Sequence, residues 1–321
     1  MHAITQSQYG TSDSLRLTDV PVPRPGEGQV LLRVHAAGLD RGTEHLMTGK
    51  PYAVRLAIGV RRPRNPVLGR DVAGTVAETG PGVTRFAPGD EVYGVAAGSF
   101  AQYAVADVDK LATKPAALSY AEAAVVPISA GTALQAVRDA ATVTSGQSVL
   151  VTGASGGVGS YAVQLAVAAG AEVTAVCSLI KRDHVTALGA HHVLDYARDD
   201  WADGTRRYDV ILDIAGNPSL RRLRRALTPH GTAVFVGGEQ AGSITGMGRQ
   251  LRGTVLSPFI GPSLKIFLAR ERGTDYEQLS GLLDAGELRP VLDRTYPLEQ
   301  AAEAMRKLEE GAIRGKVAIT M

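Results

Sequence analysis

The stretch SVLVTGASGGVGSYAVQLAVAAG, residues 148–170, decides the fold. It begins with a β-branched apolar run at 148–152, continues through a glycine-rich turn at 153–159, and passes directly into an alanine-rich segment at 160–169. Strand, turn and helix in this order are typical of a βαβ unit that binds the phosphates of a dinucleotide. Glycine is needed because the backbone must turn sharply and approach a pyrophosphate, which then lies at the positive end of the helix dipole.

The glycine pattern departs from G-x-G-x-x-G at its first position, since it reads Ala154-x-Gly156-x-x-Gly159. Alone, this pattern would also suit a tight turn in another α/β protein. An amphipathic helix is indicated by apolar residues that share one face, namely Val158, Ala162, Leu165 and Ala169. Gly170 stands where a helix cap belongs, and residues 172–176 predict a second strand. This context favours the nucleotide site.

Composition sets the broad class of protein. With 321 residues, 45% hydrophobic residues and 37 glycines, the chain suits an α/β protein of two domains. A net charge of +2 points to no polyanionic partner, and a single cysteine, Cys177, excludes a disulfide framework. The N-terminus lacks the pattern of a secretory signal, and no apolar run is long enough to span a membrane. We therefore expect a cytoplasmic enzyme with no membrane partner.

The first 120 residues differ in pattern from the centre of the chain. Short alternating segments at 30–34, 72–77, 91–95 and 100–105 are separated by turns rich in proline and glycine, which predicts a compact β-barrel-like domain. From residue 121, strands alternate with helices, as in a doubly wound parallel sheet. Further strands are expected at 193–195, 208–213, 232–236, 254–257 and 316–320, and helices at 219–227, 276–283 and 301–308.

Several short motifs follow one another along the chain. They are GxDxAG at 69–74, PGDEV at 88–92, the turn at 153–159 followed by AVQLA, LGA at 188–190, YDV at 208–210 and RGKV at 314–317. With these motifs the chain resembles the zinc-independent, zeta-crystallin-like quinone oxidoreductase branch of the medium-chain dehydrogenase/reductase family. The resemblance implies a GroES-like domain at 1–120, completed by 262–321, and a Rossmann domain that binds NADP(H) at 121–261.

We expect no metal. Zinc-dependent relatives use cysteine and a histidine–glutamate pair, whereas this chain has Gly69-Arg70-Asp71 at the corresponding place and lacks a four-cysteine lobe. Cys177 ends the second Rossmann strand, where a small buried apolar residue is the simpler interpretation. The histidines stand singly or, at His191 and His192, point apart on a strand.

NADPH is the expected cofactor. The second strand ends in Cys177-Ser178 rather than in the acidic residue that bonds the ribose of NAD, and Lys181 and Arg182 follow. A hydroxyl and a cation accommodate a 2′-phosphate, which a carboxylate would repel. By resemblance, Lys181 and Tyr196 contact that phosphate, although a solvated helix start would also explain Lys181. The remaining expected cofactor contacts are Ser155, Gly156, Gly157 and Val158 in the turn, Gly237 and Gly238 after a later strand, and Lys316 near the C-terminus.

The expected substrate-side residues come from the resemblance. Thr132, near Ser129, matches the segment that enters the crevice between the domains, and Tyr52 loosely matches a tyrosine that enoyl reductases use. Tyr52 could equally be packed under a loop. Asp40 stands where many relatives have asparagine. It could shuttle a proton or, as we slightly prefer, pair with Arg41 or Arg55 as plain structure.

Two arginine-rich segments remain. The loop that holds Arg55, Arg61, Arg62 and Arg64 is either a substrate lid that meets an acidic group or, more simply, a solvated surface. The helix at 219–227 carries four arginines, which we interpret as its wet face. RNA binding is the weaker alternative, so we expect no nucleic-acid partner.

These features predict an NADPH-dependent reductase that transfers hydride to quinones or α,β-unsaturated carbonyls without a metal. An enoyl-thioester reductase is the nearer alternative, and a non-catalytic NADPH-binding sensor or structural protein is the alternative of another class. We expect a homodimer by analogy, with residues 254–256 as an edge strand that pairs across a twofold axis.

Overall fold

The strand–turn–helix at 148–170 lies in the second of two structural units. The computed structural model describes residues 1–237, 248–256 and 261–321. Unit 1 comprises Met1–Gly131 and Glu271–Met321, and unit 2 comprises Thr132–Arg270. The boundaries expected from the sequence, 120/121 and 261/262, lie somewhat earlier in the chain.

Unit 2 is built on a parallel sheet of six strands in the order β10-β9-β8-β11-β12-β13. The strands are β8 (Ser148–Thr152), β9 (Glu172–Cys177), β10 (His192–Asp195), β11 (Tyr208–Asp213), β12 (Leu227–Phe235) and β13 (Ser263–Ile266). The chain starts in the middle, winds outward to β10, and returns to add β11 on the other side of β8. This reversal creates a switch point between β8 and β11, where parallel sheets bind ligands beyond the carboxyl ends of their strands.

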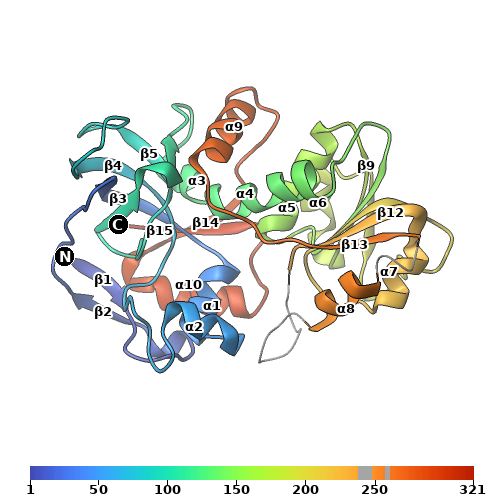
Figure 1. Cartoon of the computed structure of the whole chain (residues 1–321), viewed down its shortest axis with the longest axis horizontal. Coiled ribbons are helices and arrows are strands. Elements are labelled where there is room, and N and C mark those ends of the chain that lie inside the picture. Colours follow the sequence, from blue (N-terminus) through green and yellow to red (C-terminus); the bar gives the residue numbers. More distant parts are fainter. Residues whose placement is uncertain (238–247, 257–260) are drawn as a thin grey trace. The chain divides into compact units, whose positions relative to one another are not determined.

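Helices cover both faces of this sheet, with α5 and α6 on one side and α7 and α8 on the other (Figure 1). They are α5 (Gly157–Ala168), α6 (Arg182–Ala187), α7 (Leu220–Ala226) and α8 (Gly248–Leu256); η5 (Leu179–Lys181) precedes α6, and α4 (Pro127–Gln135) with the π-helical η4 (Ala136–Ala140) precedes β8. Residues 159–166 of α5 are all buried. The amphipathic pattern expected for this helix is therefore wrong, because the helix is enclosed rather than half exposed. Gly170 does cap it, with a φ of 81°.

The prediction of a strand at 254–257 is also wrong. Residues 254–256 form the end of helix α8, and Ser257 lies outside the described residues. The edge of the sheet is β13, which pairs in parallel with β12. The expected homodimer therefore stays a prediction without the edge strand on which it was based.

Unit 1 contains a seven-stranded sheet in the order β14-β15-β3-β4-β5-β7, with β6 paired to β3, and a separate two-stranded sheet of β1 and β2. The strands are β1 (His2–Thr5), β2 (Arg16–Asp19), β3 (Gln29–Leu39), β4 (Asp71–Thr79), β5 (Glu91–Val95), β6 (Tyr103–Asp107), β7 (Leu111–Thr113), β14 (Leu292–Pro297) and β15 (Lys316–Thr320). The C-terminal β15 lies between β14 and the N-terminal β3. Unit 1 is thus assembled from both ends of the sequence.

Short helices surround the sheet of unit 1. They are η1 (Ser12–Ser14), α1 (Arg41–Thr48), η2 (Tyr52–Val54), α2 (Arg55–Ile58), η3 (Val108–Lys110), α3 (Tyr120–Ala124), α9 (Gly273–Asp284), η7 (Leu298–Gln300) and α10 (Ala301–Glu309). A core that includes Leu39, Met47 and Phe100 packs against Met305 of α10 and Ile319 of β15. Among the described residues, none of the helices has the length and apolar character needed to cross a bilayer.

Candidate functional site

The glycines of the turn at 153–159 differ in what requires them. A Cβ added to Gly159 would lie 2.1 Å from the Gly153 carbonyl oxygen, so α5 can approach the turn only with glycine there. Gly153 has a φ of 66°, in the left-handed region that favours glycine. A Cβ at Gly156 would meet only the Gly153 oxygen at 3.4 Å, which is ordinary contact. Packing within the protein therefore does not require glycine at 156, whereas close approach of a phosphate would.

Two buried polar side chains, Thr152 and Asp213, lie at the ends of the strands on either side of the switch point. Thr152 at the end of β8 accepts hydrogen bonds through its Oγ1 from the backbone N–H groups of Ile214 and Ala215, at 3.0 and 3.3 Å. Asp213 at the end of β11 pairs with Arg249 of α8 at 2.7 Å. Burial raises the pKa of Asp213 to about 6, and the guanidinium of Arg249 opposes that rise. Sequence reasoning missed this pair because Asp213 and Arg249 lie far apart in the chain.

The residues expected to contact the 2′-phosphate meet at the end of β9. The backbone N–H of Tyr196 donates to the Cys177 carbonyl at 3.1 Å, and that of Lys181 donates to the Ser178 carbonyl at 2.9 Å. Tyr196 is exposed, whereas Cys177 is buried and burial raises the pKa of its thiol. Arg182 donates to the Val193 carbonyl at 3.2 Å, so its guanidinium ties α6 to β10.

The other expected residues of the central segment have mixed placements. Gly237 follows β12, and a Cβ there would lie 1.8 Å from the Ile214 carbonyl oxygen, so only glycine fits. Gly238 lies outside the described residues. Thr132 is half buried in α4, and Ser129 in the same helix is buried. The expected cofactor contacts of Ser155, Gly157 and Val158 stay predictions, as do the roles of Gly237 and Thr132.

A cluster of three buried charges lies inside unit 1. Lys316 Nζ is 2.9 Å from Asp71 Oδ2 and 3.7 Å from Asp40 Oδ2. Asp71 also accepts from the Ile128 N–H at 2.8 Å. Asp40 caps α1 by accepting from the Thr43 N–H at 2.8 Å. Lys316 is thus enclosed by carboxylates, while its expected contact with a cofactor stays a prediction.

The charges of this cluster shift one another's proton affinity. Burial raises the pKa of Asp71 to about 7; Lys316 opposes the rise and Asp40 adds to it. Burial alone would lower the pKa of Lys316, but the charges of Asp71 and Asp40 outweigh burial and raise it. The cation found beside Asp40 is Lys316, while Arg41 pairs with Glu44 at 2.5 Å and Arg55 stacks on aromatic rings; the expected pairing of Asp40 with Arg41 or Arg55 stays a prediction. The pairing with Lys316 joins segments that the sequence keeps far apart.

Tyr52 stands on η2 with 45% of its surface exposed. The Arg55 guanidinium lies 4.8 Å from the centre of its ring and 4.4 Å from that of Tyr9. Arg55 also donates to the Gly49 carbonyl at 3.0 Å. The ring of Tyr52 is therefore held by a cation, and its proposed substrate contact stays a prediction.

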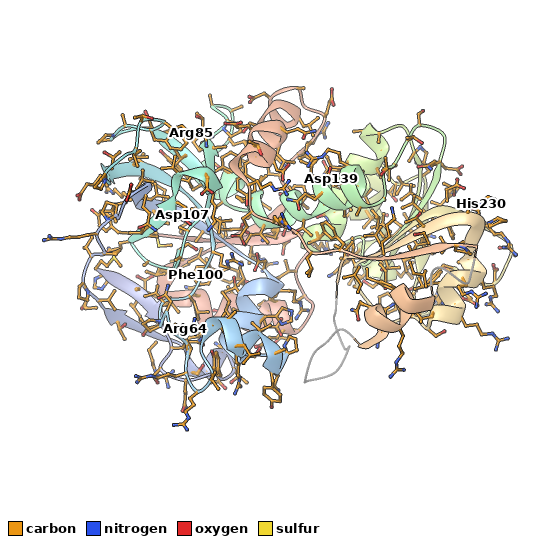
Figure 2. All side chains as sticks on the ribbon, in the orientation of Figure 1. Arg64, Arg85, Phe100, Asp107, Asp139 and His230 are labelled. Atoms are coloured by element: carbon orange, nitrogen blue, oxygen red, sulfur yellow. The ribbon has the colours of Figure 1, made fainter. Side chains whose placement is uncertain are left out.

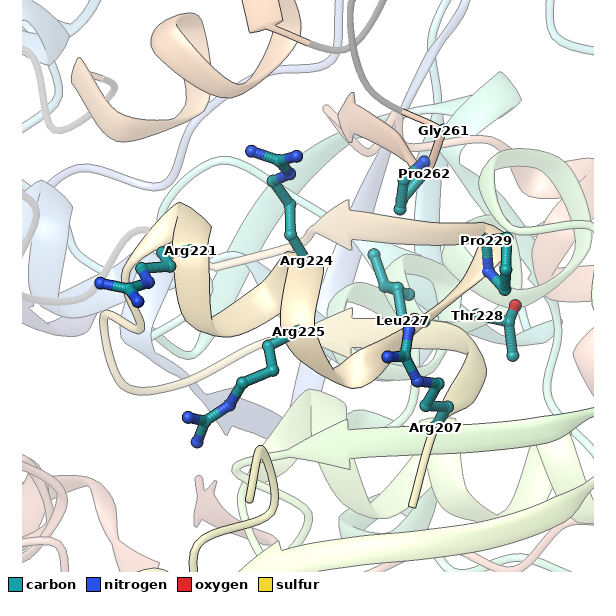
Figure 3. A pocket seen from close by; sticks show the side chains of 9 residues that line it. All are labelled: Arg207, Arg221, Arg224, Arg225, Leu227, Thr228, Pro229, Gly261 and Pro262. Atoms are coloured by element: carbon teal, nitrogen blue, oxygen red, sulfur yellow. Dashed lines mark hydrogen bonds between the residues drawn. The ribbon is translucent and has the colours of Figure 1, made fainter. Parts of the chain in front are cut away.

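The arginines of α7 border a cavity of about 540 Å³ in unit 2 (Figure 3). Arg221, Arg224 and Arg225 project from the helix in different directions, as Figure 3 shows, and all three are exposed. Arg225 pairs with Asp200 at 2.8 Å, and Arg222 pairs with the same carboxylate at 2.9 Å while lying over the Trp201 ring. The wet-face interpretation is confirmed for the three exposed arginines, whereas Arg222 is half buried.

The residues present do not suit a catalytic zinc. Within the part of the chain that the structure describes, no group of three or more histidine, cysteine or acidic side chains is placed to hold a metal ion. The two carboxylates that come together, Asp40 and Asp71, already face the Lys316 ammonium. A lysine in that position repels a divalent cation.

Comparisons with known proteins agree with this architecture. Residues 26–116 match the family described as alcohol dehydrogenase GroES-like domain, and residues 188–319 match the one described as zinc-binding dehydrogenase. A chloroplastic quinone-oxidoreductase homologue of Spinacia oleracea is 33% identical, over 99% of this chain and 98% of that relative. A 2-methylene-furan-3-one reductase of Solanum lycopersicum is 32% identical, over 99% of this chain and 79% of that relative.

A solved structure extends the likeness to three dimensions. The quinone oxidoreductase of Coxiella burnetii superposes with a TM-score of 0.87 at 27% identity, covering 100% of this chain and 99% of that one. The fold, the order of the motifs and full-length identity above 30% all lead to the same assignment. The chain belongs to the medium-chain dehydrogenase/reductase superfamily, in its quinone oxidoreductase-like branch.

Proposed function

We propose that the chain is an NADPH-dependent oxidoreductase that reduces quinones or α,β-unsaturated carbonyls without a metal. The observation that carries the proposal is Gly156, a glycine that internal packing does not require, in a turn at the switch point of the sheet. The bound dinucleotide supplies the hydride. The amides of the turn and the N-terminus of α5 bind its pyrophosphate, because they present N–H groups and the positive end of the helix dipole.

The preference for NADPH over NADH is proposed from the end of β9. Ser178 and Lys181 lie there beside Tyr196, and the place of the ribose-binding acid is taken by a serine. A cation in this position stabilises the 2′-phosphate by a charge-assisted hydrogen bond. The metal-free reaction is supported by the cluster of Asp40, Asp71 and Lys316, which offers a divalent cation no open coordination position. For Asp40, these contacts favour the structural alternative over the proton shuttle.

The test is consumption of NADPH and NADH with 9,10-phenanthrenequinone, a simple enone and crotonyl-CoA. We expect turnover of the quinone or the enone, with NADPH preferred. In Lys181→Ala, the KM for NADPH rises about tenfold or more through loss of a charge-assisted hydrogen bond, while the KM for NADH changes little. Arg182→Ala is the matched control, because its guanidinium bonds a backbone carbonyl and should affect both cofactors equally.

Three outcomes would contradict the proposal in different ways. Turnover of crotonyl-CoA alone would favour an enoyl-thioester reductase. Binding of NADPH without turnover of any substrate would favour a sensor or structural protein. Equal effects of Lys181→Ala on both cofactors would remove the assignment of the 2′-phosphate site.

A further inference from the structure

A cavity of about 260 Å³ lies within unit 1, and none of its lining residues was assigned a role in the site described above. Its walls come from the residue after β1, from α1, and from α2 with the loop that follows it, and are completed by the segments at 67–70 and 97–98. Arg64 in this loop and the core residue Phe100 can be located in Figure 2. The cavity therefore lies beside the arginine-rich loop whose purpose the sequence left open.

A residue that lines this cavity carries a buried amide oxygen without a partner. Gln6 lines it and is only 3% exposed, and its Nε2 donates to the Leu46 carbonyl at 3.1 Å. That bond fixes the orientation of the amide, because a flipped side chain would bring two oxygens together. Within the described residues, Gln6 Oε1 is buried and has no hydrogen-bond partner. A buried acceptor left unpaired is costly, so a ligand that donates a hydrogen bond here would gain affinity.

Another part of the cavity wall belongs to a segment that is rich in positive charge. Between Glu44 and Asp71 the sequence has no acidic residue but carries Lys50, Arg55, Arg61, Arg62, Arg64 and Arg70. Arg70 is neutralised by Glu271. Arg64 lines the cavity and donates to the neutral Ala57 carbonyl at 3.1 Å, and it has no acidic partner in the part of the chain described. A carboxylate of a ligand would give Arg64 the counter-charge that the protein does not supply.

The rest of the lining is apolar and limits the size of a ligand. Leu46, Ile58, Val67 and Leu68 contribute aliphatic surface. Leu46 packs on the core, and the backbone of Leu68 is bonded to Ile4 and Phe100 at 3.1 and 2.9 Å, so this part of the wall is firmly held. Two backbone hydrogen bonds also fix the loop, from Arg64 to Ile58 at 2.8 Å and from Gly59 to Arg55 at 2.8 Å. A preformed apolar cavity of this volume suits a single small ring or a short branched chain.

We propose that this cavity binds a compact apolar molecule that carries one carboxylate, which faces Arg64, and one hydroxyl, which donates to Gln6 Oε1. The identification of this molecule as a substrate rests on the proposed function. The reductase would act on hydroxylated, monocarboxylic quinones or enones, and the cavity would hold the part of the substrate that does not react. The arginine-rich loop then selects substrates by charge.

The experiment measures binding to the full chain in the absence of NADPH, by calorimetry or ligand-observed NMR. The probes are the three hydroxybenzoate isomers, benzoate, which lacks the hydroxyl, and phenol, which lacks the carboxylate. We expect the best hydroxybenzoate to bind about tenfold more tightly than benzoate and about tenfold more tightly than phenol. Equal affinity for all three kinds of probe would overturn the proposal.

Variants assign the two contacts separately. Arg64→Gln should remove the advantage of hydroxybenzoate over phenol, and Gln6→Leu the advantage over benzoate. Arg62→Gln is the matched control, since Arg62 is exposed on the same loop and does not line the cavity. Equal effects of Arg64→Gln and Arg62→Gln would overturn the assignment of Arg64, whose exposed side chain can be replaced without loss of folding.

The two proposals can fail independently. If phenanthrenequinone is reduced but no hydroxybenzoate binds, the cavity proposal is overturned and the proposed function stands. If hydroxybenzoate binds as described but no quinone or enone is reduced, the binding site is supported and the proposed function is overturned.

Discussion

Lys316 brings an ammonium group into the interior of unit 1, where only 1% of its side chain is exposed. Two carboxylates face this single cation, so the cluster carries one excess negative charge when all three groups are ionised. Burial of a complete ion pair contributes little net stability, whereas removal of one partner leaves an uncompensated charge in a medium of low dielectric constant. The cluster is therefore sensitive to loss of its lysine.

We predict that Lys316→Met lowers the free energy of unfolding at pH 7 by about 3–5 kcal/mol, because Asp40 and Asp71 then face each other without a cation. The loss should be smaller at pH 5, where Asp71, whose pKa burial raises to about 7, takes up a proton. Urea unfolding at both pH values is the measurement. Lys110→Met, which removes a half-exposed pair with Asp107, is the control and should cost about 1 kcal/mol or less. Equal losses in the two variants would contradict this account.

At the scale of single residues, the sequence predicted the placement of those that depend on near neighbours, while their roles stay predictions. The glycines of the turn and Ser178 at the end of β9 belong to this group, since their places follow from a local strand–turn–helix pattern. The partner of Lys316 was not predictable, because Asp71 lies 245 residues away and only the sheet brings them together. The available signal was the aspartate in the GxDxAG motif. That motif indicated the family resemblance but assigned no role to the aspartate.

Among the elements, α5 and its turn form the proposed pyrophosphate site. Two glycine substitutions separate packing from binding there. We predict that Gly159→Ala lowers Tm, because the new Cβ would fall 2.1 Å from the Gly153 oxygen, at a cost of about 1–3 kcal/mol typical of overpacking. Gly156→Ala should leave Tm nearly unchanged, since its Cβ has room, and should weaken NADPH binding. Thermal unfolding and a fluorescence titration with NADPH measure the two effects. Unaltered NADPH affinity in Gly156→Ala would argue against a pyrophosphate at this turn.

Strands with clear alternation or continuous β-branched runs were predicted well, and β5, β8, β11 and β15 have the bounds expected. The strand expected at 254–257 was wrong for a physical reason. A segment with only two apolar residues, Val255 and Leu256, does not distinguish a strand from one turn of a helix, and residues 248–256 are helical. The strand that does end the sheet, β13, contains a serine and a lysine among four residues, so its composition gave little signal.

For the whole molecule, a buried aspartate with a raised pKa stands in each unit, Asp71 at about 7 and Asp213 at about 6. In the unfolded chain these carboxyls lose their protons near pH 4. Between pH 5 and 7 the folded state therefore binds more protons than the unfolded state, and these groups make stability fall as pH rises. His35, whose pKa is lowered by burial and by Arg33, acts in the opposite direction.

We predict that the Tm difference between the native sequence and Asp71→Asn changes with pH from 5 to 8, in the direction that favours the native sequence at low pH. Asp213→Asn should show the same sign at slightly lower pH. Calorimetric unfolding at three pH values checks both, and Asp109→Asn, a solvated carboxylate in η3, is the control. A pH-independent difference would mean that neither carboxyl takes up its proton in the folded protein.

The placement of β15 also has a consequence for biosynthesis. It is an interior strand of the unit 1 sheet, between β14 and β3, yet the ribosome makes it only after the whole of unit 2. Until β15 is synthesised, the edge of β3 with which it later pairs has no partner strand. Asp40 and Asp71 then also lack the ammonium group of Lys316. Unit 2, whose residues are contiguous, can fold in the meantime. An unpaired sheet edge of this kind can pair with other chains, so it is a surface that chaperones shield in the nascent protein.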